Sequence, residues 1–426
     1  MNLLQFLDKS PVNFLAVQTL AQELEAAGFK ALNATQPLPP IEVGGQFYVT
    51  KNDSSIYAFR MGRQKLADAG FRMICAHCDS PTFRIKPNAE MRCEGNLVKL
   101  NTEVYGGPIM STWFDRPLSL AGRVILRGID ALHPQTRLLH IAKPVVVIPN
   151  LAIHFNRQVN DGVKLSRQKD MLPILGIINE QLEGGVLLNL ISEELKVEKQ
   201  NILDFDLYLY DATPACLVGL NDEFVSSGRL DDLSMVHAGL QAMLSASRSP
   251  EVTQVLAVFD NEETGSQTKQ GAASPFLSAM LQRIVQAQGG SPDDYFRAVE
   301  QAFMVSADNA HAWHPNYSEK YDPTNHPQMG GGPVVKINAA QKYATDASSA
   351  SVFAEVCHEA GVPCQYFVNH SDVAGGSTLG NILASSLPVR GVDMGNPIWA
   401  MHSCRETGSV ADHNYCIKAF TKFYEI

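Results

Sequence analysis

The stretch that decides the fold is VTQVLAVFDNEETG, which spans residues 252–265. It starts as an apolar, β-branched run typical of a central strand in a parallel sheet and stops abruptly at DNEE. Open α/β sheets bind ligands at the carboxyl ends of their strands, so function is expected at this end. The adjacent carboxylates of Glu262 and Glu263 repel each other unless cations compensate them, which predicts a metal site or a strongly raised pKa. A solvated loop is the alternative interpretation of the pair taken alone.

The distribution of helix and strand patterns predicts a discontinuous catalytic domain. Helical and strand-like segments alternate in residues 1–89 and again in residues 225–426, which is typical of an α/β fold. Residues 90–224 contain mostly short strand-like runs, with one helical stretch near residues 171–183. We therefore expect a mixed, largely parallel sheet flanked by helices, with an inserted and mostly β domain at residues 90–224.

Composition restricts the partners and the compartment. The net charge is −10, and the chain has no cluster of Lys and Arg suited to nucleic-acid phosphates. No apolar stretch reaches membrane-spanning length, and the opening residues MNLLQFLDKSPVNF lack the features of a signal peptide. Eight cysteines are scattered without the density of a disulfide framework, and Cys75 and Cys78 are interpreted as buried thiols rather than half a zinc site. The expected location is the cytoplasm, with neither nucleic acid nor a membrane as partner.

An imidazole and a carboxylate follow a predicted strand in MICAHCDSP, residues 73–81. His77 and Asp79 are two residues apart, so their side chains point the same way if the strand continues. A metal-binding His usually gives its second N–H to a carboxylate or carbonyl, so Asp79 is suited to orient His77. A satisfied surface pair is the alternative.

Three more candidate ligands lie at strand exits or helix starts of the α/β portion. Asp231 and its neighbour Asp232 precede the apolar-periodic segment of SSGRLDDLSMVHAG, where an Asp serves equally well as a helix cap. Asp308 follows a short apolar run in MVSADNAHAWHPNY, and His402 of WAMHSCRETG follows the apolar strand VRGVDMG. Turn chemistry or packing explains each of these alone, but such ends converge on one edge of a parallel sheet.

Together the candidate ligands match the inventory of a dinuclear zinc hydrolase. They are His77, Asp231, Glu263, Asp308 and His402. Zinc takes imidazole and carboxylate ligands, and two neighbouring metals need a shared carboxylate between them. Glu262 is left over, and it can act as general base on a metal-bound water whose pKa the metals lower towards neutrality.

Nine motifs follow one another between about residues 77 and 406. They are HCDSP, STWFDRPLSLAGRV, IPNLAIHFNR, GRLDD, DNEETGS, SADNAHAWHPNY, GGPVVKIN, GGSTLG and AMHSCRE. As a set, they resemble the successive motifs of the aspartyl aminopeptidase family of zinc metallopeptidases. The resemblance implies a metal-dependent aminopeptidase that removes N-terminal residues from peptides and prefers Asp or Glu at the first position.

The resemblance also implies a ligand set for two divalent ions, taken as zinc, with cobalt or manganese as alternatives. Asp231 is the implied bridge between the ions. His77 and Asp308 complete one implied site, and Glu263 and His402 complete the other.

The remaining implied roles concern catalysis and the substrate. Glu262 is the implied general base for a metal-bridging hydroxide that attacks the first peptide bond, and Asp79 is the implied holder of His77. His154 resembles a substrate contact donated by a neighbouring subunit, although the sequence also allows it as a metal ligand. Lys336 matches the position expected to hold the acidic side chain of the substrate, with Tyr343 nearby; a strand Lys that extends its charge into water is the alternative.

Departures from the family pattern and rival functions complete the sequence-based interpretation. Cys78 stands where Thr is common, Asp232 where Asn is common, and Gly375 and Gly376 replace a Cys-Gly context. The nearest rival function is a broad-specificity dinuclear aminopeptidase or deacylase; a more distant rival is a non-catalytic oligomeric scaffold. The resemblance further implies a homo-oligomer, with a dodecamer built from dimers expected and the inserted domain serving as a dimerisation or lid domain.

Overall fold

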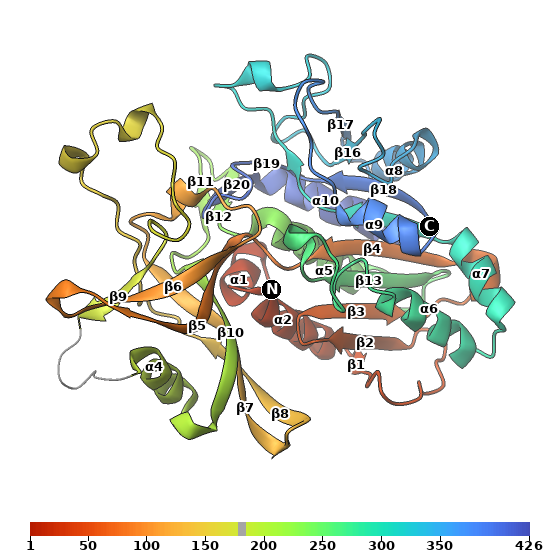
Figure 1. Cartoon of the computed structure of the whole chain (residues 1–426). Coiled ribbons are helices and arrows are strands. Elements are labelled where there is room, and N and C mark those ends of the chain that lie inside the picture. Colours follow the sequence, from red (N-terminus) through yellow and green to blue (C-terminus); the bar gives the residue numbers. More distant parts are fainter. Residues whose placement is uncertain (178–184) are drawn as a thin grey trace. The chain divides into compact units, whose positions relative to one another are not determined.

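The computed structural model describes residues 1–177 and 185–426, and its contacts divide the chain into two compact units (Figure 1). The first unit contains Met1–Asp79, Ala215–Met401 and Glu406–Ile426. The second contains Ser80–Pro214 and the short segment His402–Arg405. Each unit has a sheet and a core of its own.

A nine-stranded mixed sheet forms the centre of the first unit, in the order β1-β2-β3-β13-β4-β14-β18-β16-β17. The four strands β13, β4, β14 and β18 run parallel to their neighbours within this group. The mixed α/β fold class predicted from the sequence is therefore confirmed. The strands are β1 (Lys30–Ala31), β2 (Gln46–Lys51), β3 (Ser55–Arg60), β4 (Phe71–His77), β13 (Thr253–Phe259), β14 (Phe303–Ala307), β16 (Val334–Lys336), β17 (Gln365–Phe367) and β18 (Arg390–Gly395).

Helices cover both faces of this sheet, and alternate side chains of β4 enter opposite cores (Figure 1). Ile74 and Ala76 pack into the core that also takes side chains from α1 (Leu3–Lys9), α2 (Asn13–Ala26), α5 (Leu230–Ser245), α8 (Ala347–Glu359) and α10 (Val410–Phe423). Met73 and Cys75 pack into the core with α3 (Leu66–Ala69), α6 (Phe276–Ala287), α7 (Pro292–Gln301) and α9 (Leu379–Ser386). Burial on both faces explains why the central strands read as continuous apolar runs rather than alternating ones.

A second, five-stranded sheet of the first unit has the order β11-β12-β20-β19-β15. Its strands are β11 (Cys216–Val218), β12 (Phe224–Ser227), β15 (Ala310–His311), β19 (Pro397–Trp399) and β20 (Glu406–Ser409). The first residue of β20, Glu406, accepts the backbone N–H of Asp231 at 3.0 Å. This small sheet therefore anchors the start of α5.

The second unit is built on a six-stranded antiparallel sheet in the order β8-β7-β10-β5-β6-β9, with one described α-helix beside it. Its elements are β5 (Thr82–Arg92), β6 (Leu97–Tyr105), β7 (Leu118–Asp130), β8 (His133–His140), β9 (Ile174–Ile177), α4 (Val186–Leu195) and β10 (Ile202–Asp211). The helix predicted near residues 171–183 is wrong where the chain is described, because β9 pairs there with β6. Residues 178–183 of that prediction lie outside the described residues.

Two expectations from composition can be compared with this fold. Cys75 and Cys78 are free and buried, which confirms their interpretation as core thiols. Within residues 1–177 and 185–426, no helix combines the length and apolarity needed to cross a membrane.

Candidate metal centre

Three adjacent parallel strands end at one edge of the nine-stranded sheet and bring the predicted polar groups together. His77, the last residue of β4, lies opposite Phe259, the last residue of β13. On its other side, β4 pairs with β14, which ends one residue before Asp308. The DNEE segment after β13 and Asp308 after β14 therefore emerge beside His77, as expected for carboxyl ends of parallel strands.

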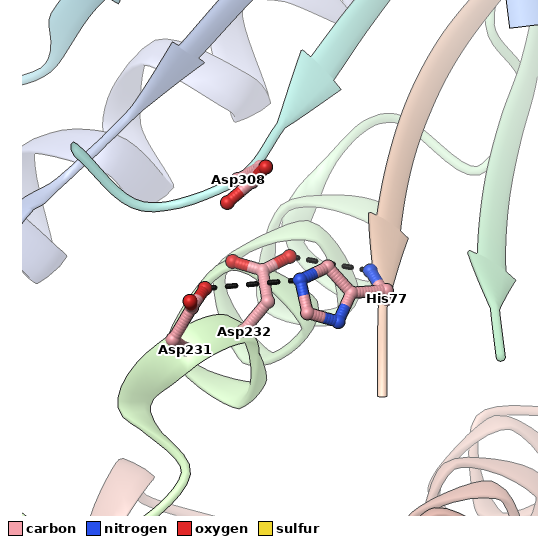
Figure 2. Close-up of side chains that lie close together, drawn as sticks. All are labelled: His77, Asp231, Asp232 and Asp308. Atoms are coloured by element: carbon pink, nitrogen blue, oxygen red, sulfur yellow. Dashed lines mark hydrogen bonds and ion pairs between the residues drawn. The ribbon is translucent and has the colours of Figure 1, made fainter. Parts of the chain in front are cut away.

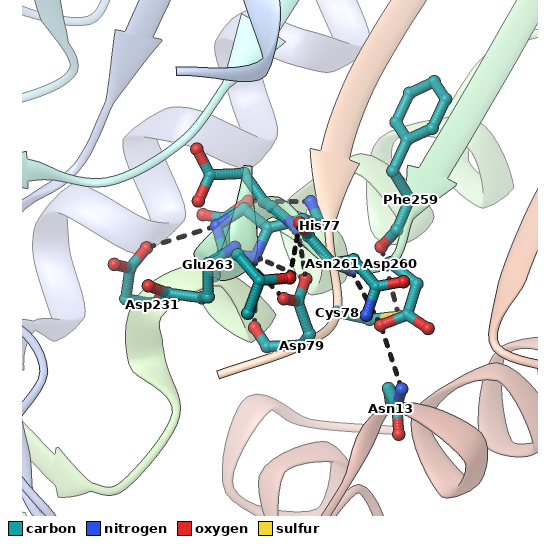
Figure 3. Close-up of polar contacts among 12 residues, drawn as sticks. Asn13, His77, Cys78, Asp79, Asp231, Phe259, Asp260, Asn261 and Glu263 are labelled. Carbon is teal, nitrogen blue, oxygen red and sulfur yellow. Dashed lines mark hydrogen bonds and ion pairs between the residues drawn. The ribbon is translucent and has the colours of Figure 1, made fainter. Parts of the chain in front are cut away.

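The His77 ring is buried and held by Asp79, whose carboxylate is itself fixed (Figure 3). The Nδ1 atom of His77 lies 3.1 Å from the Asp79 carbonyl oxygen and 3.3 Å from Asp79 Oδ1. The two Asp79 carboxylate oxygens accept the backbone N–H groups of Glu262 and Glu263, each at 3.1 Å. Because Nδ1 faces only acceptors here, it carries the proton, and Nε2 is left available as a metal ligand.

Carboxylates surround the Nε2 side of His77 (Figure 2). Asp231 Oδ1 lies 3.7 Å from Nε2. One ligand atom from each of His77, Asp231, Asp232 and Asp308 lies within 4.8 Å of the others, and all four residues are buried. A second group of such atoms consists of His77, Glu262 and Glu263. One imidazole with several carboxylates is a donor set that zinc accepts, so these residues fit a divalent metal centre.

Neither aspartate at the start of α5 acts as the helix cap that the sequence allowed. The N-cap position is Arg229, which makes no side-chain cap hydrogen bond, and the backbone dihedrals of Asp231 and Asp232 are not helical. The Asp232 carboxylate instead accepts the backbone N–H of His77 at 3.2 Å and the Asn309 side-chain amide at 3.3 Å. Asp232 thus ties β4 to the segment that carries Asp308.

The charges at this edge shift the pKa values of the acidic groups strongly. Burial together with the charges of Asp308 and Asp79 raises the pKa of Glu262 to about 8, against the opposing effect of His77. Burial likewise raises the pKa of Asp308 to about 6, and it raises the pKa of Glu263 well above its ordinary value, with Asp231 adding to the shift. Carboxylates this crowded repel one another, and divalent ions would balance their charge.

Lys336 and Tyr343 lie beside Asp308. The Nζ atom of Lys336 is 3.6 Å from Asp308 Oδ1 and 5.7 Å from the centroid of the Tyr343 ring. Lys336 has only 4% of its surface exposed, so the alternative of a strand Lys that extends its charge into water does not describe it. A buried ammonium group is therefore built into a cluster of carboxylates.

His154 and His402 belong to the second unit. His154 lies in an exposed 3₁₀ turn, Ile153–Phe155. The Nδ1 atom of His402 lies 3.1 Å from the Gly107 carbonyl oxygen, to which it donates. Within the first unit, the structure brings together eight predicted site residues: His77, Asp79, Asp231, Glu262, Glu263, Asp308, Lys336 and Tyr343.

Two contributors at this edge were missed from the sequence. Asn309 donates to the Leu230 carbonyl at 2.7 Å as well as to Asp232, so it fixes the turn that precedes Asp231. Asp260 accepts the Asn13 side-chain amide at 2.9 Å (Figure 3). In the sequence, Asn309 was marked only by its place after Asp308 in SADNAH. Asp260 was marked only by its place in DNEE, shortly before Glu262 and Glu263.

A mixed α/β sheet with a buried His and carboxylate cluster at its carboxyl edge is the architecture of a metal-dependent hydrolase. A family model described as "Aminopeptidase I zinc metalloprotease (M18)" matches residues 6–424. The chain belongs to this M18 family and is a metallo-aminopeptidase, which confirms the resemblance seen in its motifs.

Similar proteins extend over the whole chain. "Probable M18 family aminopeptidase 2" of Clostridium acetobutylicum is 52% identical over 425 residues, which covers 100% of this chain and 98% of the relative. Among solved structures, the cryo-EM structure of the Ape4 and Nbr1 complex is similar at 37% identity and a TM-score of 0.95, covering 99% of this chain and 84% of that one. The S. cerevisiae mApe1 dodecamer is similar at 25% identity and a TM-score of 0.87, covering 99% and 95%.

Asp79→Asn should weaken metal binding, because the amide no longer matches both backbone N–H groups and the His77 ring loses its fixed orientation. Loss of such an outer partner typically costs about 10–100-fold in metal affinity. Competition with a zinc-binding dye measures this affinity. Asp293→Asn, at an exposed position in α7, is the matched control and should leave the affinity unchanged. Equal affinities in all three proteins would contradict the role of Asp79.

Proposed function

We propose that the chain is a dinuclear aminopeptidase that removes Asp or Glu from the N-terminus of peptides. The observation that carries the proposal is the pairing of a compact His and carboxylate cluster with one buried lysine, Lys336, at the same sheet edge. The cluster suits metal-assisted hydrolysis of a peptide bond, and the ammonium group suits an anionic first residue.

Two divalent ions, taken as zinc with cobalt or manganese as alternatives, would be held by five residues. His77, Asp231 and Asp308 would hold one ion, and their ligand atoms lie within 4.8 Å of one another. Glu263 and His402 would hold the other ion and share Asp231 with the first. We assign Asp232 to holding β4 and Asn309 rather than to an ion, because its oxygens already accept two hydrogen bonds.

The chemistry of the site follows from the divided roles of Glu262 and Glu263. When bound, the ions supply the Lewis acidity that polarises the scissile carbonyl and eases ionisation of the attacking water. Glu262, which is only partly buried, takes the proton of that water and passes it to the leaving amine. Asp79 keeps His77 in the tautomer that leaves Nε2 available. His154, donated by a neighbouring subunit, would stabilise the developing oxyanion.

Selectivity for an acidic first residue would come from Lys336 and Tyr343. The ammonium of Lys336 lies 3.6 Å from Asp308 Oδ1 and over the ring of Tyr343. A substrate carboxylate beside this ammonium would find a positive partner, whereas a neutral side chain would gain no ionic contact from it. The metal cluster alone would not discriminate between these substrates.

Assembly and compartment are part of the proposal. We infer a homo-oligomer, a dodecamer built from dimers, with residues 80–214 supplying the contacts, since the similar S. cerevisiae structure is a dodecamer. Exposed apolar side chains in this segment support contacts there: Ile129, Leu132 and Phe155 are 87%, 87% and 81% exposed. A cytoplasmic location is supported by the eight cysteines, which are scattered along the chain without the density of a disulfide framework.

Glu262→Gln should retain the bound metals and lose nearly all turnover, because the amide cannot accept the proton of the attacking water. A missing general base typically lowers kcat by about 10²–10⁴-fold. Metal content and peptide hydrolysis, measured on the same preparation, separate the two effects. Glu300→Gln, on the exposed side of α7, serves as control and should behave like the wild type. Undiminished turnover in Glu262→Gln would remove Glu262 from the mechanism.

Lys336→Met should reduce kcat/KM for Asp- and Glu-initiated peptides by about 10–100-fold more than for a Leu-initiated peptide, since a desolvated charge partner is lost. The methionine keeps the apolar length of the side chain. A three-peptide panel on metal-loaded enzyme provides the measurement. Equal losses for all three peptides would favour the broad-specificity aminopeptidase instead.

A further inference from the structure

Another buried carboxylate, that of Asp393, lies in β18 near the proposed substrate-binding residues and has no part in the mechanism above. Its side chain has no exposed surface. In the sheet, β18 lies between β14 and β16, so Asp393 is opposite Ser306, two residues before Asp308. On the other side, β18 pairs with β16, the strand that ends at Lys336.

Asp393 ties two loops to the sheet through short hydrogen bonds. Its Oδ2 atom accepts the backbone N–H of Ala344 at 2.6 Å, and its Oδ1 atom accepts the Thr378 hydroxyl at 2.5 Å. Its own backbone N–H donates to the Thr345 hydroxyl at 2.8 Å. One residue thus holds the loop before α8, which carries Tyr343, and the loop before α9, which carries the GGSTLG motif.

The packing around this carboxylate explains a glycine of that motif. A Cβ atom at Gly380 would lie 2.5 Å from both Asp393 oxygens, which is too close for any side chain. The carboxylate therefore sits against the first turn of α9, where helix geometry favours negative charge. Thr378, the N-cap of α9, makes no cap hydrogen bond of its own and gives its hydroxyl to Asp393.

These contacts converge on Lys336. Tyr343, which lies under the Lys336 ammonium, immediately precedes the Ala344 N–H held by Asp393. The ammonium experiences the negative charges of Asp308 and Asp393. Under the proposed function, Asp308 binds a metal ion, which balances its charge. Asp393 is then the other carboxylate whose negative charge acts on the Lys336 ammonium.

We propose that Asp393 is a positioning residue that fixes the Tyr343 and Thr378 loops around Lys336 and thereby sets recognition of the first residue of the substrate. This inference rests on the proposed function. It assigns Asp393 to neither metal binding nor proton transfer, so its loss should change substrate selection while the metal centre stays intact.

The experiment compares Asp393→Asn and Thr378→Val with wild type on metal-loaded protein, using Asp- and Leu-initiated peptides. The amide of Asp393→Asn can accept from only one of its two donors, and Thr378→Val removes one donor with little change in volume. In both variants, KM for the Asp-initiated peptide should rise about tenfold relative to the Leu-initiated peptide, with kcat and metal content nearly unchanged. Thr378→Ser keeps the hydroxyl and should restore the wild-type ratio.

Asp412→Asn is the matched control. Asp412 is also fully buried and accepts two backbone N–H groups, of Gly330 and Gly332, each at 2.7 Å, but it lies outside the two loops. Its substitution should lower stability without changing the substrate ratio. If Asp412→Asn changed the ratio of KM values for the two peptides as much as Asp393→Asn does, Asp393 would have only a general structural role. That result would overturn the inference.

The remaining outcomes separate the inference from the proposed function. If Asp393→Asn does not fold, the comparison of Thr378→Val with Thr378→Ser decides, because both retain the carboxylate. If the wild type prefers acidic peptides but the folded variants keep its ratio of KM values for the two peptides, only the role of Asp393 is overturned. A wild type without acidic preference overturns the proposed specificity, and the inference with it.

Discussion

Carboxylates held out of water at the carboxyl edge of the nine-stranded sheet are the constraint on which the rest of the structure depends. Parallel strands β4, β13 and β14 end side by side, so the residues that follow them have little freedom to separate. The result is that His77 and Asp308 crowd into one small volume, and Asp231 at the start of α5 joins them there. Such crowding is unfavourable unless cations or protons balance the charge, and a divalent ion balances it without protonating the groups.

The surrounding structure keeps these groups crowded by using other polar side chains as fixed supports. Asp79 binds two backbone N–H groups of the DNEE segment, and Asp232 joins β4 to Asn309. Glu406 holds the start of α5, and Asp393 holds the loops near Lys336. Each of these side chains accepts hydrogen bonds from backbone or side-chain donors. Together, these bonds keep the carboxylates of the cluster from moving apart. This is the physical content of preorganisation in a metal centre.

The fold and much of the candidate site could be predicted from the sequence because they depend on local patterns. A strand buried on both faces is mostly apolar, as residues 255–259 are, and polar residues directly after it lie at the sheet edge. His77, Glu263 and Asp308 were recognisable for that reason. The family membership followed from the order of several such motifs, which a single motif would not have established.

Contacts between distant segments could not be predicted in the same way. Asp260 and Asn13 are 247 residues apart, and Asp393 meets Ala344 and Thr378 only because β18 lies beside β16 in the sheet. Over its described part, the helix predicted near residues 171–183 was wrong for a related reason, since pairing with β6 overrides the local pattern in β9. Asp232 was likewise a plausible helix cap until its partners across the edge were known.

The central claim is that this edge works as a pair of metal sites, and a metal titration of stripped protein tests it most directly. Protein treated with a chelator would be dialysed and titrated with zinc while bound metal and hydrolysis of an Asp-initiated peptide are followed together. The account predicts that the stripped protein is inactive and that binding and activity both saturate at two ions per chain. Full hydrolysis by metal-free protein, or saturation of activity at a single ion, would contradict it.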